Sequence, residues 1–170
     1  MTKYIALLRA VNVGGTGNLP MSELKALCCD AGFQSVQTYI ASGNVVFQSS
    51  AAASKVKKEL ERRLHQHAGK PVAVLVRSAS EMAAVLQANP FPDAAPNLTH
   101  VVFLDEPLAA RALDNIAGQQ DEKVRAGVQE IFIHYPNGMG RSKLRIPAAK
   151  NGTARNMNTV AKLVEIASKM

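Results

Sequence analysis

A glycine-rich run near the start of the chain has the residue types that hold phosphate groups. Arg9 precedes the run from Asn12 to Asn18, in which Gly14 and Gly15 are adjacent. Loops of this kind between a strand and a helix bind phosphate through backbone N–H groups, and a neighbouring arginine can clamp the anion. The run lacks the third glycine of a dinucleotide-binding loop and the lysine of a P-loop. The alternatives are a wide turn that needs glycine and a structural salt bridge or carbonyl bond for Arg9.

Two further segments place hydroxyl, amide and cationic groups at the ends of predicted elements. Ser42-Gly43-Asn44 is a turn between two predicted strands. A polar segment near the end of the chain opens the predicted last helix, whose free N–H groups and partial positive charge attract anions. The alternative is that one asparagine of this segment serves only as the helix cap, which leaves its other polar residues unexplained. The candidates here are Arg155, Asn156, Asn158 and Thr159, with Lys143 nearby in the sequence.

The positive charge of the chain is concentrated in its last fifth. The 170 residues carry a formal net charge of +7. Residues 1–135 contain 13 Lys and Arg against 12 Asp and Glu, whereas residues 136–170 contain seven Lys and Arg against Glu165 alone. This asymmetry predicts an anionic partner, either a phosphate-containing small molecule or a nucleic-acid backbone. The alternative is a solvated basic face that only aids solubility.

Several classes of function find no support in the sequence. His65 and His67 face different sides of a predicted helix and acidic pairs with ligand spacing are absent, so we expect no metal and no cofactor. Ser42 is not in a Gly-x-Ser-x-Gly motif and no histidine stands beside it in the sequence, so a serine nucleophile is possible but unsupported. Whether the protein is an enzyme stays open at this point. No apolar run is long enough to span a membrane, and the adjacent Cys28 and Cys29 are expected as free thiols. We therefore expect a cytoplasmic protein without membrane contact.

The first half of the chain predicts the strand–helix–strand–strand–helix–strand order of a ferredoxin-like, split βαβ module. The right-handed crossover of such a module makes its first two strands parallel, so the glycine-rich run and the turn at Ser42 should be neighbours. RNA recognition by stacked aromatic side chains is not expected, because tryptophan is absent and the third strand offers only Phe47. The predicted elements are a strand at 3–11, a helix from Pro20 to Gly32, strands at 34–40 and 45–48, a helix that Ser49 or Ser50 caps and Gly69 ends, and a strand at 71–77.

The second half repeats this order without its final strand. A capping box from Ser78 to Glu81 opens a helix that Pro90 ends, and a proline-rich stretch at 91–98 follows. We therefore expect an α+β fold of two ferredoxin-like modules, 1–90 and 91–170, the second truncated, packed as one compact unit. The predicted elements of the second module are a strand at 99–104, a helix at about 107–116, strands near 123–126 and 130–135, and a helix at 158–169.

A family resemblance is carried by five segments: Arg9 to Gly15, Thr38 to Phe47, Asn89 to Phe91, Ser142 to Leu144 and Thr153 to Thr159. Together they resemble the bacterial family called domain of unknown function 1697. The resemblance implies a two-module α+β fold related to duplicated ferredoxin-like units, and it brings no established activity, cofactor or substrate. The family usually has tryptophan where this chain has Met157, which suggests a packing position and argues against an aromatic side chain that stacks on a ligand.

The glycine-rich run with Arg9, the turn at Ser42 and the polar segment before the last helix combine into one hypothesis, an anion-binding cleft. Backbone N–H groups of Gly14 and Gly15 hold the anion, Arg9 and Arg155 clamp it, and Lys143 adds charge. Amide side chains fix its orientation, and the remaining candidates are Asn12, Ser42, Gly43, Asn44, Asn156, Asn158 and Thr159.

The predicted function is therefore the binding of a phosphate-bearing ligand, a nucleotide or a nucleic-acid backbone, in a basic cleft. One alternative is a small hydrolase or transferase that acts on a phosphoester, with Ser42 or a bound water as the nucleophile. The other is a protein-interaction module whose polar loops are purely structural.

Overall fold

The computed structural model describes residues 1–13 and 17–170 of the chain. The predicted phosphate-binding positions Gly14 and Gly15 lie outside the described residues. Among the helices of this described part, none is both long and apolar enough to cross a membrane.

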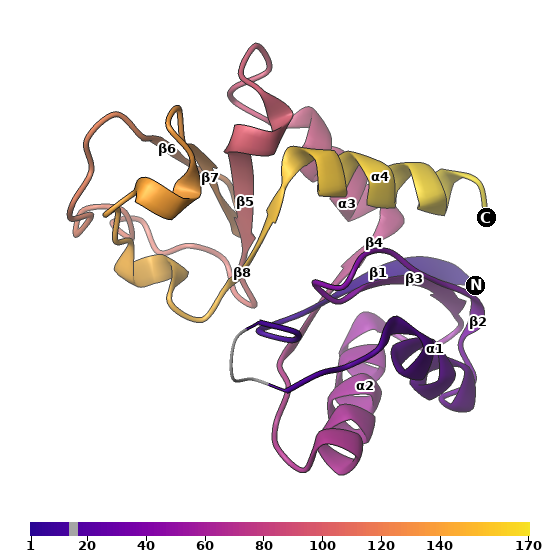
Figure 1. Cartoon of the computed structure of the whole chain (residues 1–170). Coiled ribbons are helices and arrows are strands. Elements are labelled where there is room, and N and C mark those ends of the chain that lie inside the picture. Colours follow the sequence, from indigo (N-terminus) through magenta and orange to yellow (C-terminus); the bar gives the residue numbers. More distant parts are fainter. Residues whose placement is uncertain (14–16) are drawn as a thin grey trace. The chain divides into compact units, whose positions relative to one another are not determined.

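The chain forms two compact units, one of which is discontinuous in sequence (Figure 1). The first unit consists of residues 1–83 together with residues 162–170, and the second consists of residues 84–161. The predicted modules were each continuous, with their boundary after residue 90. The observed first unit also takes in the C-terminal residues, so it draws on both ends of the described chain.

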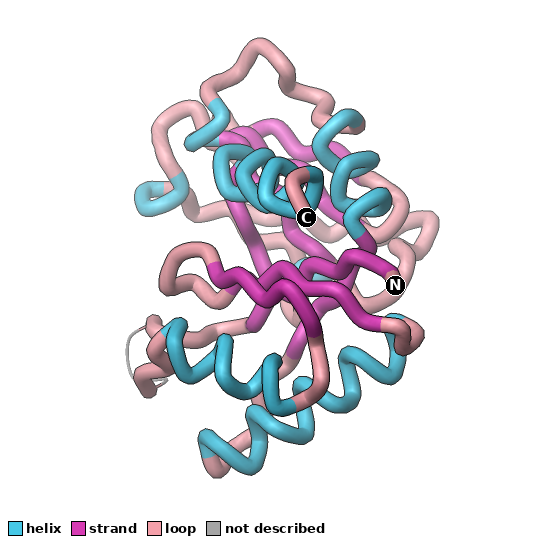
Figure 2. Tube along the Cα trace, turned by 90° about the vertical axis from the view of Figure 1, so that its right-hand side faces the viewer, coloured by secondary structure: helices cyan, strands magenta, loops and turns pink. Residues whose placement is uncertain are grey.

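The first unit contains a four-stranded antiparallel sheet with two helices on one face (Figure 1, Figure 2). Its elements are β1 (Thr2–Leu8), α1 (Met21–Asp30), β2 (Gln34–Thr38), β3 (Asn44–Ser49), α2 (Ala53–Ala68), β4 (Val74–Ser78) and the first part of α3 (Ala79–Gln87). The strands lie in the order β2-β3-β1-β4. Because β1 and β2 are each antiparallel to β3, they are parallel to each other, as predicted.

One apolar core lies between this sheet and the helices α1 and α2. Phe47 of β3 has no exposed surface and stacks on Phe33, with ring centroids 4.3 Å apart. Cys28 has no exposed surface and belongs to this core, which confirms it as a packing residue, and this burial raises the pKa of its thiol to about 12. The helices contribute their apolar stripes, namely Leu24 and Cys28 of α1 and Val56, Leu60 and Leu64 of α2.

Two boundaries in the first unit differ from the prediction. The first strand ends at Leu8 rather than at residue 11, because Ala10 and Asn12 have positive φ angles that a strand does not adopt. Arg9 therefore follows the strand and does not lie on it. The long helix α2 begins without a side-chain cap, since the Ser49 hydroxyl instead accepts a hydrogen bond from the N–H of Ala51, 3.1 Å away.

Two helix-end predictions are confirmed. Gly69 ends α2 in the left-handed conformation, with a φ of 73°. At the start of α3, the Ser78 hydroxyl accepts a hydrogen bond from the Glu81 N–H at 3.1 Å, and a Glu81 carboxylate oxygen accepts one from the Ser78 N–H at 2.9 Å. These two bonds form the predicted capping box.

The second unit contains another four-stranded antiparallel sheet, in the order β6-β7-β5-β8. Its elements are the end of α3, β5 (Thr99–Phe103), β6 (Lys123–Ala126), β7 (Glu130–His134), β8 (Thr153–Asn156), the start of α4 (Met157–Ser168) and short 3₁₀ helices at Pro96–Leu98, Met139–Arg141 and Pro147–Ala149. Together the units give the mixed α+β fold that the sequence predicts.

Two predictions for the second unit are wrong. The segment 107–116 forms turns instead of a helix, and its apolar residues still pack into the core of the unit. The chain next to it is paired elsewhere, since Ala117 and Arg145 exchange backbone hydrogen bonds of 2.9 and 2.8 Å. The unit also has a fourth strand, β8, which precedes the last helix. Sequence reasoning missed β8 because its polar residues are typical of a helix start.

Candidate functional site

Asn12 joins the two loops that the crossover geometry predicts to be neighbours. Its side-chain N–H groups donate to the carbonyl oxygens of Leu19, at 2.8 Å, and Ala41, at 2.7 Å. Its side-chain oxygen accepts a hydrogen bond from the N–H of Leu19. The predicted proximity of the two loops is therefore confirmed, and these three bonds give the Asn12 amide a role in holding the loops together.

The turn from Ser42 to Asn44 is shaped by its own hydrogen bonds. Asn44 has no exposed surface, and its side-chain nitrogen donates to the Tyr39 carbonyl and the Ser42 hydroxyl, both at 2.8 Å. Gly43 has a φ of 89°, and its carbonyl accepts a hydrogen bond from the Leu8 N–H at 2.8 Å. An amide N–H group donates but takes up no proton, so Asn44 cannot act as a general base for Ser42.

A cavity of about 730 Å³ lies next to these loops, within the first unit. The segment that follows β1 lines one side and the segment that precedes β4 lines the other, because β1 and β4 are antiparallel neighbours. Arg9, half-buried, lines it on the β1 side, where its backbone N–H donates to the Ala73 carbonyl at 2.9 Å. The other lining residues are Ala10, Val11, Gly17, Asn18, Leu19, Leu64, His67, Ala68, Lys70, Pro71, Val72 and Ala73.

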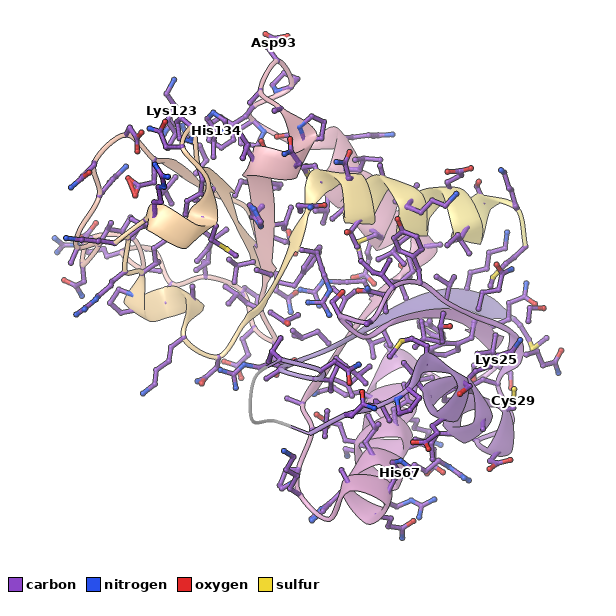
Figure 3. The ribbon with its side chains drawn as sticks, in the orientation of Figure 1. Lys25, Cys29, His67, Asp93, Lys123 and His134 are labelled. Atoms are coloured by element: carbon purple, nitrogen blue, oxygen red, sulfur yellow. The ribbon has the colours of Figure 1, made fainter. Side chains whose placement is uncertain are left out.

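The charges around this cavity are positive. Arg9 and Lys70 line it together with His67, which projects from the C-terminal part of α2 (Figure 3). None of the described residues that line it is acidic. His67 Nε2 lies 2.9 Å from a carboxylate oxygen of Glu23, which stands outside the lining. Lys70 reaches the glycine-rich loop, since a Cβ atom added at Gly17 would lie 3.9 Å from the Lys70 ammonium nitrogen.

Sequence reasoning missed Lys70 and His67 as site residues. A signal for Lys70 was present in the predicted topology, because a strand that pairs with β1 in antiparallel fashion must begin where β1 ends. Leu8 at the end of β1 lies opposite Val74 at the start of β4. The residues just before β4 are therefore brought beside Arg9. No comparable signal points to His67, whose position depends on the length of α2.

The candidates near the C-terminus lie in the second unit, where Arg155 belongs to β8. Its side chain is only 7% exposed, and its Nη1 donates to the Thr153 hydroxyl at 3.1 Å and the Ala154 carbonyl at 2.9 Å. Burial lowers the pKa of the Arg155 guanidinium to about 10, so it stays charged at neutral pH. The sequence predicts Arg155 at the start of the last helix, and the structure places it in the strand β8 instead.

Asn156 is the cap of α4. Its side-chain oxygen accepts a hydrogen bond from the N–H of Thr159 at 2.9 Å. Asn158 is exposed, whereas Thr159 is buried. Met157, at the position of the family's tryptophan, is buried as well, which confirms it as a packing residue.

We expect Asn156→Ala to lower the free energy of unfolding by about 1 kcal/mol, because the substitution removes the cap. Asn156→Asp should keep the wild-type value, since an aspartate oxygen accepts the same bond. Urea denaturation measures both variants. Asn158→Ala is the matched control, and a loss there as large as that of Asn156→Ala would contradict the assignment of the cap.

The structure thus divides the predicted site residues between the two units. Arg9, Asn12, Ser42, Gly43 and Asn44 belong to the first unit, and only Arg9 among them lines its cavity. The second unit holds the remaining described candidates, and its Lys143 lines a separate cavity of about 670 Å³. A single cleft formed by both groups stays a prediction. No cluster of three or more His, Cys, Asp and Glu side chains suited to a metal ion occurs among residues 1–13 and 17–170.

Comparisons with known proteins identify both the fold class and the family of this chain. The structure of a conserved bacterial protein from Streptococcus pneumoniae is similar, with a TM-score of 0.81 and 24% sequence identity, over 98% of this chain and 98% of that chain. The likeness shows a shared α+β fold with two four-stranded antiparallel sheets. The chain belongs to the family described as protein of unknown function, DUF1697, whose model matches residues 1–132. A comparison with curated proteins found no match.

Proposed function

We propose that the protein binds a phosphate-bearing small molecule of about nucleotide size in the cavity of the first unit. The observation that carries this proposal is that Arg9 and Lys70 line one cavity beside the glycine-rich loop. A guanidinium group binds phosphate oxygens in a bidentate manner, and a lysine ammonium adds a mobile point charge. The proposal assigns binding and no chemical step.

The size and the walls of the cavity support a ligand with both an anionic and an apolar part. Small-molecule sites have volumes of about 300–1,000 Å³, and this cavity has about 730 Å³. Val11, Leu19, Leu64 and Val72 provide apolar parts of the same lining. Such a mixed lining suits a nucleotide, whose base is largely apolar and whose phosphates are charged.

We expect adenosine triphosphate to raise the melting temperature of the wild type by about 5–10 °C when its concentration is ~100-fold above the dissociation constant. The double variant Arg9→Gln with Lys70→Gln should lose this rise, because the cations that bind the phosphates are gone. Inorganic pyrophosphate, which has no base, serves as a second probe and should give a smaller rise. Differential scanning fluorimetry and isothermal titration calorimetry measure the effects.

The matched control is Lys55→Gln with Lys58→Gln, which removes the same charge from exposed positions of α2. It should keep the wild-type response to both probes. The proposal fails if the wild type responds to neither probe, or if the Arg9 and Lys70 double variant responds like the control.

We also propose that both units are ferredoxin-like modules. The first has the element order and the strand order β2-β3-β1-β4 of that fold, and the second repeats the strand order as β6-β7-β5-β8. In the second unit, turns stand where the first helix of such a module is expected. A cytoplasmic location is part of the same proposal, supported by the free thiols of Cys28 and Cys29.

A further inference from the structure

An extended segment, residues 142–146, follows the 3₁₀ helix Met139–Arg141, and from Arg141 onward the residues alternate between the surface and the interior of the second unit. Ser142 points inward, where its hydroxyl donates to a carboxylate oxygen of the buried Glu122 at 2.6 Å. Leu144 and Ile146 are half-buried and pack against the apolar core of the unit. This alternation is typical of an extended segment with one buried face.

The outward positions of this segment are all cationic. Arg141, Lys143 and Arg145 are exposed, and we call these three residues the cationic strip. Within the part of the chain that the structure describes, no ion pair or side-chain hydrogen bond involves any of them. Some of the other cations in the described chain pair with carboxylates instead.

In α2, for example, Arg62 and Arg63 both pair with Glu59, and these arginines hold the pKa of that carboxyl at about 2. In α4, Lys162 and Lys169 share Glu165. The three charges of the cationic strip have no carboxylate partner among the described residues and are open to an external anion, as are those of the exposed Lys25, Lys55 and Lys58.

Backbone contacts fix the cationic strip in place. Arg145 and Ala117 exchange two backbone hydrogen bonds, of 2.8 and 2.9 Å. Gly118 lies so close to the strip that an added Cβ atom would clash with the Lys143 carbonyl oxygen. Lys143 and Arg145 line a cavity of about 670 Å³ together with these residues. The backbone that carries these cations is therefore fixed by hydrogen bonds and packing, and it lies beside a cavity.

We propose that the cationic strip binds the phosphates of a single-stranded nucleic-acid backbone, at a site separate from the cavity of the first unit. Lys143 and Arg145 are alternate residues of an extended segment, which are roughly 7 Å apart, and Arg141 ends the 3₁₀ helix just before it, so the three cations follow one another as a linear polyanion requires. The cationic strip contains no aromatic side chain on which a base could stack. We therefore expect its contacts to be made with the phosphates and not with the bases.

A protein partner fits this surface less well. Protein interfaces depend on buried aromatic and apolar anchors, and the apolar residues of this segment point inward. The nearby carboxylates already accept hydrogen bonds within the unit. Glu122 accepts one from the Ser142 hydroxyl, and Asp121 accepts one from the Asn137 side-chain nitrogen.

The test measures the binding of a fluorescein-labelled oligothymidylate by fluorescence anisotropy over a range of salt concentrations. The triple variant R141Q/K143Q/R145Q should bind at least about tenfold more weakly at low salt. The slope of log affinity against log salt should fall by roughly 2, because each lost phosphate contact on a single strand removes ~0.7. The melting temperature should stay unchanged, since all three side chains are exposed.

The matched control K25Q/K55Q/K58Q removes three exposed charges from the first unit and should keep the wild-type slope. The Arg9 and Lys70 double variant should also bind the oligonucleotide normally, which separates this proposal from the proposed nucleotide site. Equal losses in the strip variant and the control would overturn the proposal. So would tighter strip-dependent binding of poly-glutamate or of vesicles of anionic lipid than of the oligonucleotide.

Discussion

Replacing Gly43 with alanine is expected to lower the free energy of unfolding by about 3 kcal/mol. Two costs combine. The φ of 89° is unfavourable for any residue with a Cβ atom, which costs about 1–2 kcal/mol. The new Cβ would lie 2.7 Å from Val11 Cγ2 and 2.9 Å from Leu8 Cβ, and overpacking of this kind costs about 1–3 kcal/mol. Urea denaturation followed by circular dichroism measures the loss.

Gly32→Ala separates the two costs. Gly32 has a φ of 86°, close to that of Gly43, but no atom lies within 4 Å of its added Cβ. We expect this variant to lose only about 1 kcal/mol. Equal losses at the two glycines would show that the close approach to Leu8 and Val11 contributes nothing. A displaced Leu8 also moves the adjacent Arg9, so Gly43→Ala should also weaken the proposed binding of adenosine triphosphate in the first-unit cavity.

Phe47→Ala is expected to cost about 4 kcal/mol, the usual loss for a large aromatic side chain in a core. Phe47 has no exposed surface, stacks on Phe33, and has the Tyr4 ring centroid 6.0 Å from its own. Its removal leaves a cavity that the surrounding strands and helices cannot fill by collapse. Chemical denaturation measures the effect, and a loss below about 1 kcal/mol would contradict this packing.

Phe47→Leu tests the same position against the aromatic mode of RNA recognition. Leucine keeps most of the buried volume, so the variant should remain folded. Oligonucleotide binding by Phe47→Leu should equal that of the wild type, because the ring faces α1 and α2 and is covered by the core. A selective loss of binding would instead point to stacking of bases on this side chain.

The regular parts of the fold could be predicted from local patterns. The strand at Lys123–Ala126 matches its predicted bounds, and the capping box at Ser78 and the glycine that ends α2 mark the helix ends correctly. These signals are local, because each depends on residues within one turn or one strand. The segment 107–116 forms turns and not the predicted helix, and the neighbouring Ala117 pairs with Arg145, a contact between residues far apart in sequence that local patterns do not reveal.

The candidate site could be predicted only in part, for a similar reason. The meeting of the loops at Asn12 and Ala41 follows from strand order and handedness, and it is confirmed. The placement of Arg9 and Lys70 in one cavity follows from the antiparallel pairing of β1 with β4, which the predicted topology contains but no local motif marks. Asn156 is the helix cap that the sequence offered as an alternative, but Arg155, predicted to stand in the polar segment before the last helix, lies in a strand whose polar sequence gives no periodic signal.

The first unit is discontinuous in sequence, so its two segments are synthesised at different times. Residues 1–83 leave the ribosome early, but the segment 162–170 that completes their unit is made only after residues 84–161. Domains generally fold as units while the chain grows. Here the unit that starts first finishes second, so a chain that stops after residue 161 would contain the whole second unit but only part of the first.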